Sequence, residues 1–85
     1  MAVTREQLLQ ISETIGCISA DLANYVNKAT STVQGSGAEK IPGVMESASA
    51  VSKSISGAIE AANQCRQLIR SKVSWMEANG VASLQ

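Results

Sequence analysis

The sequence has no histidine and no phenylalanine, and its only aromatic residues are Tyr25 and Trp75. Histidine is the commonest general base and the commonest metal ligand, so its absence removes every Ser-His and Cys-His arrangement. The acidic residues are dispersed rather than paired. The two cysteines, Cys17 and Cys65, stand without histidine or clustered acids and make no zinc site. We therefore expect no enzymatic activity, no catalytic residue, no metal and no cofactor.

Net charge and long apolar runs are also lacking. The chain holds 7 Lys plus Arg and 7 Asp plus Glu, and this zero balance argues against a nucleic-acid partner. No apolar run approaches the roughly 18 residues of a membrane span. The N-terminal residues lack a basic segment followed by an apolar one, so no secretory signal is visible. The compartment stays unassigned: we expect a cytoplasmic chain or one exported by a signal-independent route.

Small side chains supply much of what is present. Alanine and serine occur twelve times each, and small side chains remove little area from water, at roughly 25 cal/mol per Å². The 85 residues make one domain at most, over 1–85. A chain this short with few bulky residues is hard to stabilise alone. We therefore expect a protein partner, either a second copy of the chain or another helical protein.

Glycine and proline cluster near the middle and divide the chain into two helical segments. Thr4 and Gln7 fit a capping box, in which each side chain satisfies a free backbone amide of the first turn. They predict a first helix from about 4 to 34, followed by a loop over about 35–41.

The second helix is predicted from about 42 to 79. Pro42 is tolerated in a first helical turn. Gly80 is a C-terminal stop, and Val81 is placed to pack back on Met76 in a Schellman-type ending. Residues 80–85 are expected to be a frayed tail.

Apolar residues recur at alternating steps of three and four in both predicted helices. The first stripe comprises Leu8, Ile11, Ile15, Ile18, Leu22, Tyr25, Ala29 and Thr32. The second comprises Ile41, Val44, Ala48, Val51, Ile55, Ala58, Ala62, Cys65, Ile69, Lys72 and Met76. A mean step of 3.5 residues is typical of coiled coils. The sequence thus predicts an all-α antiparallel helical hairpin with coiled-coil packing, completed by oligomerisation into a helical bundle or filament.

We call the line of contact between the two predicted helices the seam, which the two stripes would form. The second helix is apolar beyond its seam stripe. The candidate protein interface consists of its two flanks and its last turns: Met45, Ile59, Ala61, Leu68, Val73, Trp75 and Met76. A two-helix seam needs only the central stripe, so the wider stripe predicts a further helix. The last turns should also project past the first helix and leave Trp75 for a partner. Two alternatives stay open: the flanks merely broaden the hairpin seam, or one of the chain ends folds back over Trp75.

In size and predicted build the chain resembles two groups of small exported hairpins, the type III secretion needle subunits and the secreted hairpins of the Trp-x-Gly class. The loop QGSGAEKIPG lacks the Trp-x-Gly motif, and the C-terminal segment departs from the needle signature. The likeness is therefore one of architecture. The function it suggests is a structural subunit of a secretion-type filament or complex that self-associates through the second helix. The alternative is a small adaptor or chaperone-like module that binds a different protein through Val73, Trp75 and Met76.

Overall fold

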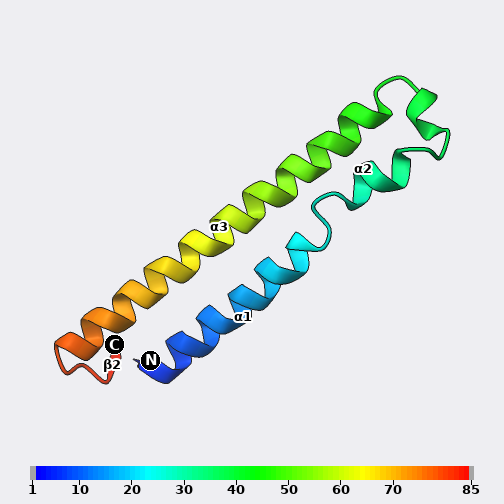
Figure 1. Cartoon of the computed structure of the whole chain (residues 1–85). Helices are drawn as coiled ribbons and strands as arrows, with labels where there is room; N and C mark the ends of the chain where they lie inside the picture. Colours follow the sequence, from blue (N-terminus) through cyan, green and yellow to red (C-terminus); the bar gives the residue numbers. More distant parts are fainter. Residues whose placement is uncertain (1, 85) are drawn as a thin grey trace.

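Two long helical arms lie side by side and run in opposite directions (Figure 1). The computed structural model describes residues 2–84. Its elements are β1 (Val3–Thr4), α1 (Arg5–Ala23), α2 (Lys28–Val33), the 3-10 helix η1 (Ala38–Lys40), α3 (Val44–Ala78) and β2 (Ser83–Leu84). The first arm consists of α1 and α2, and the second is α3. The molecule is extended, at 61 × 21 × 15 Å, and mostly helical, in line with the predicted all-α class.

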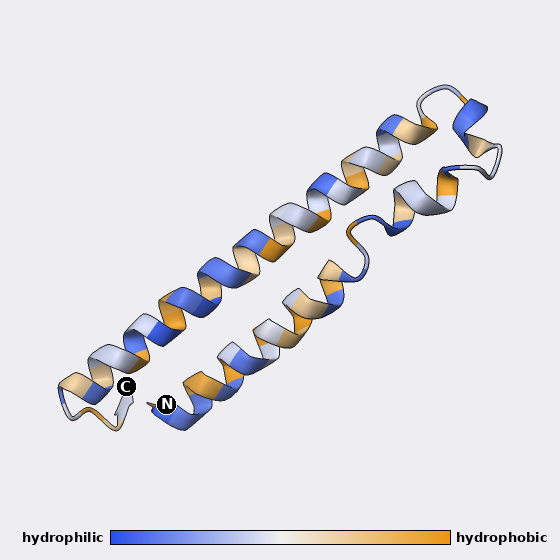
Figure 2. Cartoon of the chain, in the orientation of Figure 1, coloured by the Kyte–Doolittle hydropathy of each residue, from blue (hydrophilic) through white to orange (hydrophobic). Residues whose placement is uncertain are grey.

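The start of α1 follows the predicted capping box. The backbone amide of Gln7 donates to the Thr4 hydroxyl at 3.2 Å, and the backbone amide of Thr4 donates to Oε1 of Gln7 at 2.9 Å. Both bonds satisfy amides that have no partner within the helix. Apolar and polar residues alternate along both arms, as expected of amphipathic helices (Figure 2).

The first arm is broken, and the single helix predicted over 4–34 is wrong at residues 24–27. The amides of Asn24 and Tyr25 bond to carbonyls only three residues earlier, those of Asp21 and Leu22. The segment reads Asn-Tyr-Val-Asn, four residues of low helix propensity in succession. The helix tightens and stops there, and α2 begins afresh at Lys28.

The turn between the arms depends on glycine backbone geometry. Gly35, Gly37 and Gly43 have φ values of 80°, 94° and 86°, a region that side chains disfavour. The Glu39 carboxylate accepts hydrogen bonds from the amides of Gly35 and Gly37. Gly43 is the N-cap of α3, so Pro42 lies in the turn rather than in the helix, and the connection is longer than the predicted 35–41.

The end of α3 has the predicted Schellman geometry. Gly80, with φ 66°, donates to the Glu77 carbonyl at 3.4 Å, and Val81 donates to the Met76 carbonyl at 2.8 Å. The prediction of a frayed tail is wrong for residues 81–84, because β2 pairs antiparallel with β1, and the Arg5 amide bonds to the Ala82 carbonyl at 3.3 Å. Residue 85 lies outside the described part of the chain. The ends therefore meet, and α3 does not overhang freely.

The seam between the arms uses half of the predicted stripe on each helix. We call residues spaced by seven a column, because they stack along one side of a helix. One column of each helix is buried or half-buried as predicted: Leu8, Ile15, Leu22 and Ala29 on the first arm, and Ala48, Ile55, Ala62, Ile69 and Met76 on α3.

The second column of the predicted stripe is wrong on both helices. Most of its members are exposed: Ile11, Ile18, Tyr25, Val51, Ala58, Cys65 and Lys72. The next residue along the chain takes each place in the seam: Ser12, Ser19, Val26, Ser52, Ile59, Arg66 and Val73. Cys65 is accordingly an exposed free thiol, as is Cys17, rather than the buried residue expected.

Small side chains face the seam on α1. A Cβ placed on Gly16 would lie 3.1 Å from Cζ of Arg66, so the Arg66 side chain packs closely over Gly16. Ser12 and Ser19 are buried at 2% and 8% exposure, and only Ala48, Val73 and Met76 form a buried apolar core among the described residues. Each helix carries three neighbouring apolar or small columns, but one neighbouring helix can cover only two of them. On α1 the column with the smaller members, Ser12 and Ser19, faces inward. On α3 the inward column instead holds Ile59 and Arg66, which are larger than the outward Ala58 and Cys65.

Candidate protein interface

Large apolar side chains gather on one side of the seam. Ile11 and Ile18 of α1, with Tyr25 in the break that follows it, form the column of the first arm that borders the seam on this side. They are 45–56% exposed. On α3 the same side carries Val51, which shares a groove with Leu22 of α1. Beyond it lie Leu68 and Trp75, one column further round the helix, at 73% and 48% exposure. We call this surface the apolar face, defined by Ile11, Ile18, Tyr25, Val51, Leu68 and Trp75.

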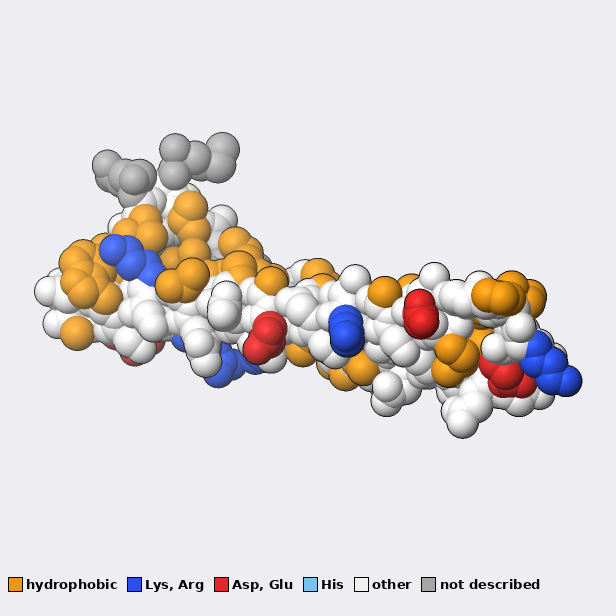
Figure 3. Space-filling model, turned by 90° about the horizontal axis from the view of Figure 1, so that it is seen from above, with side chains coloured by type: hydrophobic (Ala, Val, Ile, Leu, Met, Phe, Trp, Pro, Cys, Tyr) orange, Lys and Arg blue, Asp and Glu red, His pale blue; other side chains and the backbone are white. Residues whose placement is uncertain are grey.

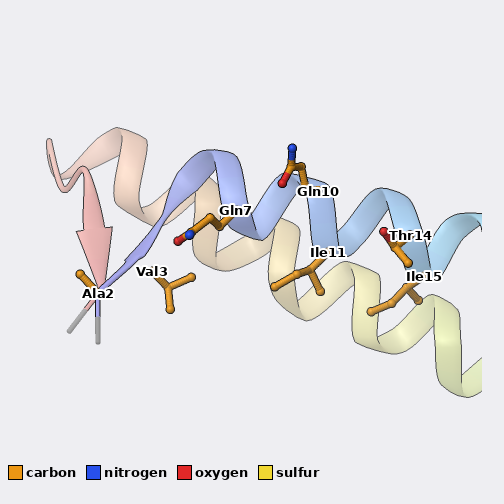
Figure 4. Close-up of a pocket in the computed structure, with 7 residues that line it drawn as sticks. All are labelled: Ala2, Val3, Gln7, Gln10, Ile11, Thr14 and Ile15. Carbon is orange, nitrogen blue, oxygen red and sulfur yellow. The ribbon is translucent and has the colours of Figure 1, made fainter.

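A groove on the apolar face lies near the chain ends. In Figure 4, Ile11 and Ile15 project side by side from α1, and Val3 of β1 lies beyond them toward the N-terminus. Gln7, Gln10 and Thr14 line the rest of this groove. The pairing of β1 with β2 fixes Val3 at this end. The groove is therefore an ordered, largely apolar surface at the end of the molecule where β1 pairs with β2.

A second groove lies near the middle of α3 and is lined mostly by small residues. Its lining residues are Leu22, Ser47, Ala50, Val51, Ser54, Ile55 and Ala58. Leu22 of α1 and Ile55 of α3 lie along this same groove. Because serine and alanine leave room above the helix backbone, this groove can receive a larger side chain from another molecule.

Trp75 has a fixed neighbour on its own helix. The Lys72 ammonium stands over the indole ring, with 4.1 Å between Nζ and the ring centroid, which is a cation–π contact. The ring still exposes about half of its area. The contact orients the ring and leaves an accessible aromatic surface, the kind of side chain that dominates many protein interfaces.

The seven residues predicted as the interface divide into two groups. Ala61, Leu68 and Trp75 share one column and are exposed. Met45, Ile59 and Val73 belong to the seam column instead, and Met76 has no exposed area. Val73 and Met76 therefore offer no surface to a partner in this conformation. The sequence analysis missed Ile11, Ile18, Tyr25 and Val51 because it assigned them to the seam; the signal was the presence of three apolar columns on one helix.

The opposite face carries more charged side chains. A groove there is lined by Ser12, Glu13, Gly16, Arg66 and Arg70, together with Leu9, Cys17 and Ala20. Polar atoms within the seam lack partners: Oγ of Ser12, Oγ of Ser52 and Nε of Arg66 are buried without a hydrogen bond. In the view of Figure 3, charged side chains are spread along the molecule, and apolar ones gather most densely at the end that holds the termini. The single chain thus buries hydroxyl groups while it exposes isoleucine.

Other kinds of site find no support in residues 2–84. No three His, Cys, Asp or Glu side chains there come together in a group that could hold a metal ion. No helix in that range combines the length and the apolar character that a membrane crossing requires. Searches of protein-family models, curated proteins and solved structures find no match to the chain. The apolar face is therefore the candidate functional surface of the chain.

Proposed function

We propose that this chain is a non-enzymatic assembly subunit that associates with further copies of itself through the apolar face. The observation that carries the proposal is the gathering of six large, exposed apolar side chains on one side of the molecule. Soluble monomers rarely expose contiguous apolar patches beyond a few hundred Å², and larger ones mark contact sites. The absence of histidine and the dispersal of the acidic residues support a role without catalysis.

The exposed area supports association. A compact monomer of 8.9 kDa exposes about 4,800 Å², whereas this chain exposes 6064 Å². The difference, about 1,250 Å², exceeds the roughly 800 Å² that each partner buries in a standard interface. The radius of gyration, 18.9 Å, compares with about 12 Å expected for a compact domain of this length. The chain therefore exposes enough surface beyond that of a compact monomer to form one side of a standard interface.

The composition of the core supports the same proposal. Among residues 2–84, three apolar residues are buried, and two of the five buried residues are serines. A buried hydroxyl without a hydrogen bond costs on the order of 1–3 kcal/mol, and Ser12 is such a group. A single chain therefore has little free energy of unfolding to spare. Burial of Ile11, Ile18 and Leu68 against another copy would add what the core lacks.

We also propose that the arms form a hairpin with coiled-coil packing, which serves as the rigid unit of the assembly. The seven-residue spacing of both seam columns supports this. The position of Leu22 and Ile55 along one groove, at the same height on the two arms, also supports it. A rigid hairpin keeps the apolar face aligned along its length, so that a second hairpin can lie against it as a bundle.

The adaptor alternative has weaker support. It depends on Val73, Trp75 and Met76 as the contact residues, and two of these are buried within the chain. A different protein would have to bind through Trp75 and Leu68 at one end alone. Self-association instead uses the face along both arms.

Sedimentation equilibrium tests the proposal with a matched pair of variants. Ile18 and Leu9 are both on α1 and are 51% and 46% exposed, but Leu9 lies on the polar side of the seam. We expect the unmodified chain to sediment as a multiple of 8.9 kDa. Ile18→Ser should weaken this association at least tenfold, and Leu9→Ser should leave it unchanged. A monomer at all concentrations, or equal effects of the two variants, would contradict the proposal.

A further inference from the structure

One exposed column of α3 grows in side-chain size from one end to the other. Its members are Ser47, Ser54, Ala61, Leu68 and Trp75. All five are exposed, and the column lies on the apolar face beside Val51, Ala58 and Cys65. Because they are spaced by seven residues, they form one line about 42 Å long on the helix surface. We call it the size-graded column, because its side chains are small at the Ser47 end and large at the Trp75 end.

We propose that two copies of the chain pair antiparallel through this column, with a two-fold axis at Ala61. The inference rests on the self-association proposed above and gives it an orientation and a register. Antiparallel pairing brings Ser47 of one copy opposite Trp75 of the other, and Ser54 opposite Leu68. Ala61 meets its own equivalent. A two-fold axis makes each of these contacts occur twice, as in any isologous interface.

Complementary size favours this arrangement over a parallel one. A parallel pair sets Trp75 against Trp75 at one end and Ser47 against Ser47 at the other, which crowds one end and leaves a gap at the other. Tightly packed interfaces alternate large and small side chains across facing positions. In the antiparallel pair, each of the four outer layers holds one small and one large residue.

The groove near the middle of α3 is formed to receive the indole. Ser47, Ala50 and Ser54 line it, and none of them reaches far from the helix backbone. Gly57 lies in the column next to Ala61, and a Cβ on it would meet no atom of this chain within 4 Å. That open space permits a second helix to approach α3 closely near the two-fold axis.

Charge favours a second copy as the occupant. The size-graded column and its two neighbouring columns hold a single charged residue, Lys72, and that charge already stands over the Trp75 ring. Interface centres are depleted of charge in this way. The excess exposed area, about 1,250 Å² over a compact monomer, suffices for a standard interface.

Disulfide trapping between copies tests the orientation. In a Cys17→Ser, Cys65→Ser background, Ala61→Cys should form a covalent dimer under mild oxidation, because the two thiols meet at the axis. Ser47→Cys is the matched control: its thiols lie about 42 Å apart in the antiparallel pair and should not react. Trapping at both positions would show a parallel pair and overturn the inference.

Sedimentation of the same variants separates this inference from the proposed function. A non-covalent oligomer that is trapped at neither position means that the chain self-associates through other residues, so the orientation fails and the function stands. A monomer in sedimentation means that the proposed function fails as well. Trapping at Ala61→Cys alone, in a chain that sediments as an oligomer, supports both.

Discussion

Ser19 of α1 donates a hydrogen bond to Asn63 of α3, with 3.4 Å between Oγ and Oδ1. Ser19 is 8% exposed, yet its neighbour in sequence, Ile18, is 51% exposed. At this point α1 turns a small polar side chain into the seam and leaves a large apolar one outward. Soluble proteins usually bury the apolar side chain and expose the polar one.

The seam can be tested with two neighbouring positions on α3. Ile55→Asp introduces a charge at a half-buried seam position, and we expect it to cost about 2–4 kcal/mol of the free energy of unfolding. Ser56→Asp places the same charge at an exposed position and should cost less than about 0.5 kcal/mol. Circular dichroism with urea unfolding measures both. Equal stability of the two variants would show that Ile55 does not face the first arm.

Two glycines should respond with opposite signs to the same substitution. Gly57 lies within α3 with open space around its Cβ position, so Gly57→Ala should stabilise the helix by about 1 kcal/mol. Gly80 has φ 66° in the Schellman ending, so Gly80→Ala should destabilise the chain by about 1 kcal/mol. Thermal unfolding at a concentration where the chain is monomeric gives both values. A loss of stability in Gly57→Ala under those conditions would mean that α3 is bent or packed differently at this point.

A swap of residue size tests the pairing of Ser47 with Trp75. Trp75→Ser alone should weaken association by about 2 kcal/mol, because it removes a large aromatic anchor from each half of the interface. The double variant Ser47→Trp, Trp75→Ser exchanges the two partners and should recover most of that loss. Its measurement is the dissociation constant from sedimentation. A double variant no better than Trp75→Ser would contradict the antiparallel pairing.

Local signals in the sequence predicted the ends of the helices well. The capping box at Thr4 and the Schellman ending at Gly80 are set by hydrogen bonds between residues close in sequence, and both are confirmed. The break at 24–27 was missed because the apolar step from Leu22 to Tyr25 outweighed the low helix propensity of the segment. The pairing of Val3 with Leu84 was missed because it joins the two ends of the chain, and such a contact has no local signal.

The candidate site was predicted only in part, for a physical reason. The heptad pattern identifies apolar columns, but it does not decide which two of three neighbouring columns face the other arm. Ile15 and Ile55 lie in the column that both choices share, so their positions were predicted correctly. Ile11 and Ile18 depend on the choice, and in the structure Ser12 and Ser19 of the neighbouring column occupy the seam instead. The residue pattern of one helix does not show that serine, rather than isoleucine, will be buried, because this depends on how the other arm packs against it.

The fluorescence of Trp75 tests the central claim most directly, because it is the only tryptophan of the chain. If copies of the chain associate through the apolar face, a second copy removes the half-exposed indole ring from water. We therefore expect the emission maximum to move to the blue as protein concentration rises, over the same range in which sedimentation detects association. The Leu9→Ser variant should show the same shift, and Ile18→Ser should show it only at higher concentration. A water-like red emission that persists in the fully associated chain would contradict association through the apolar face.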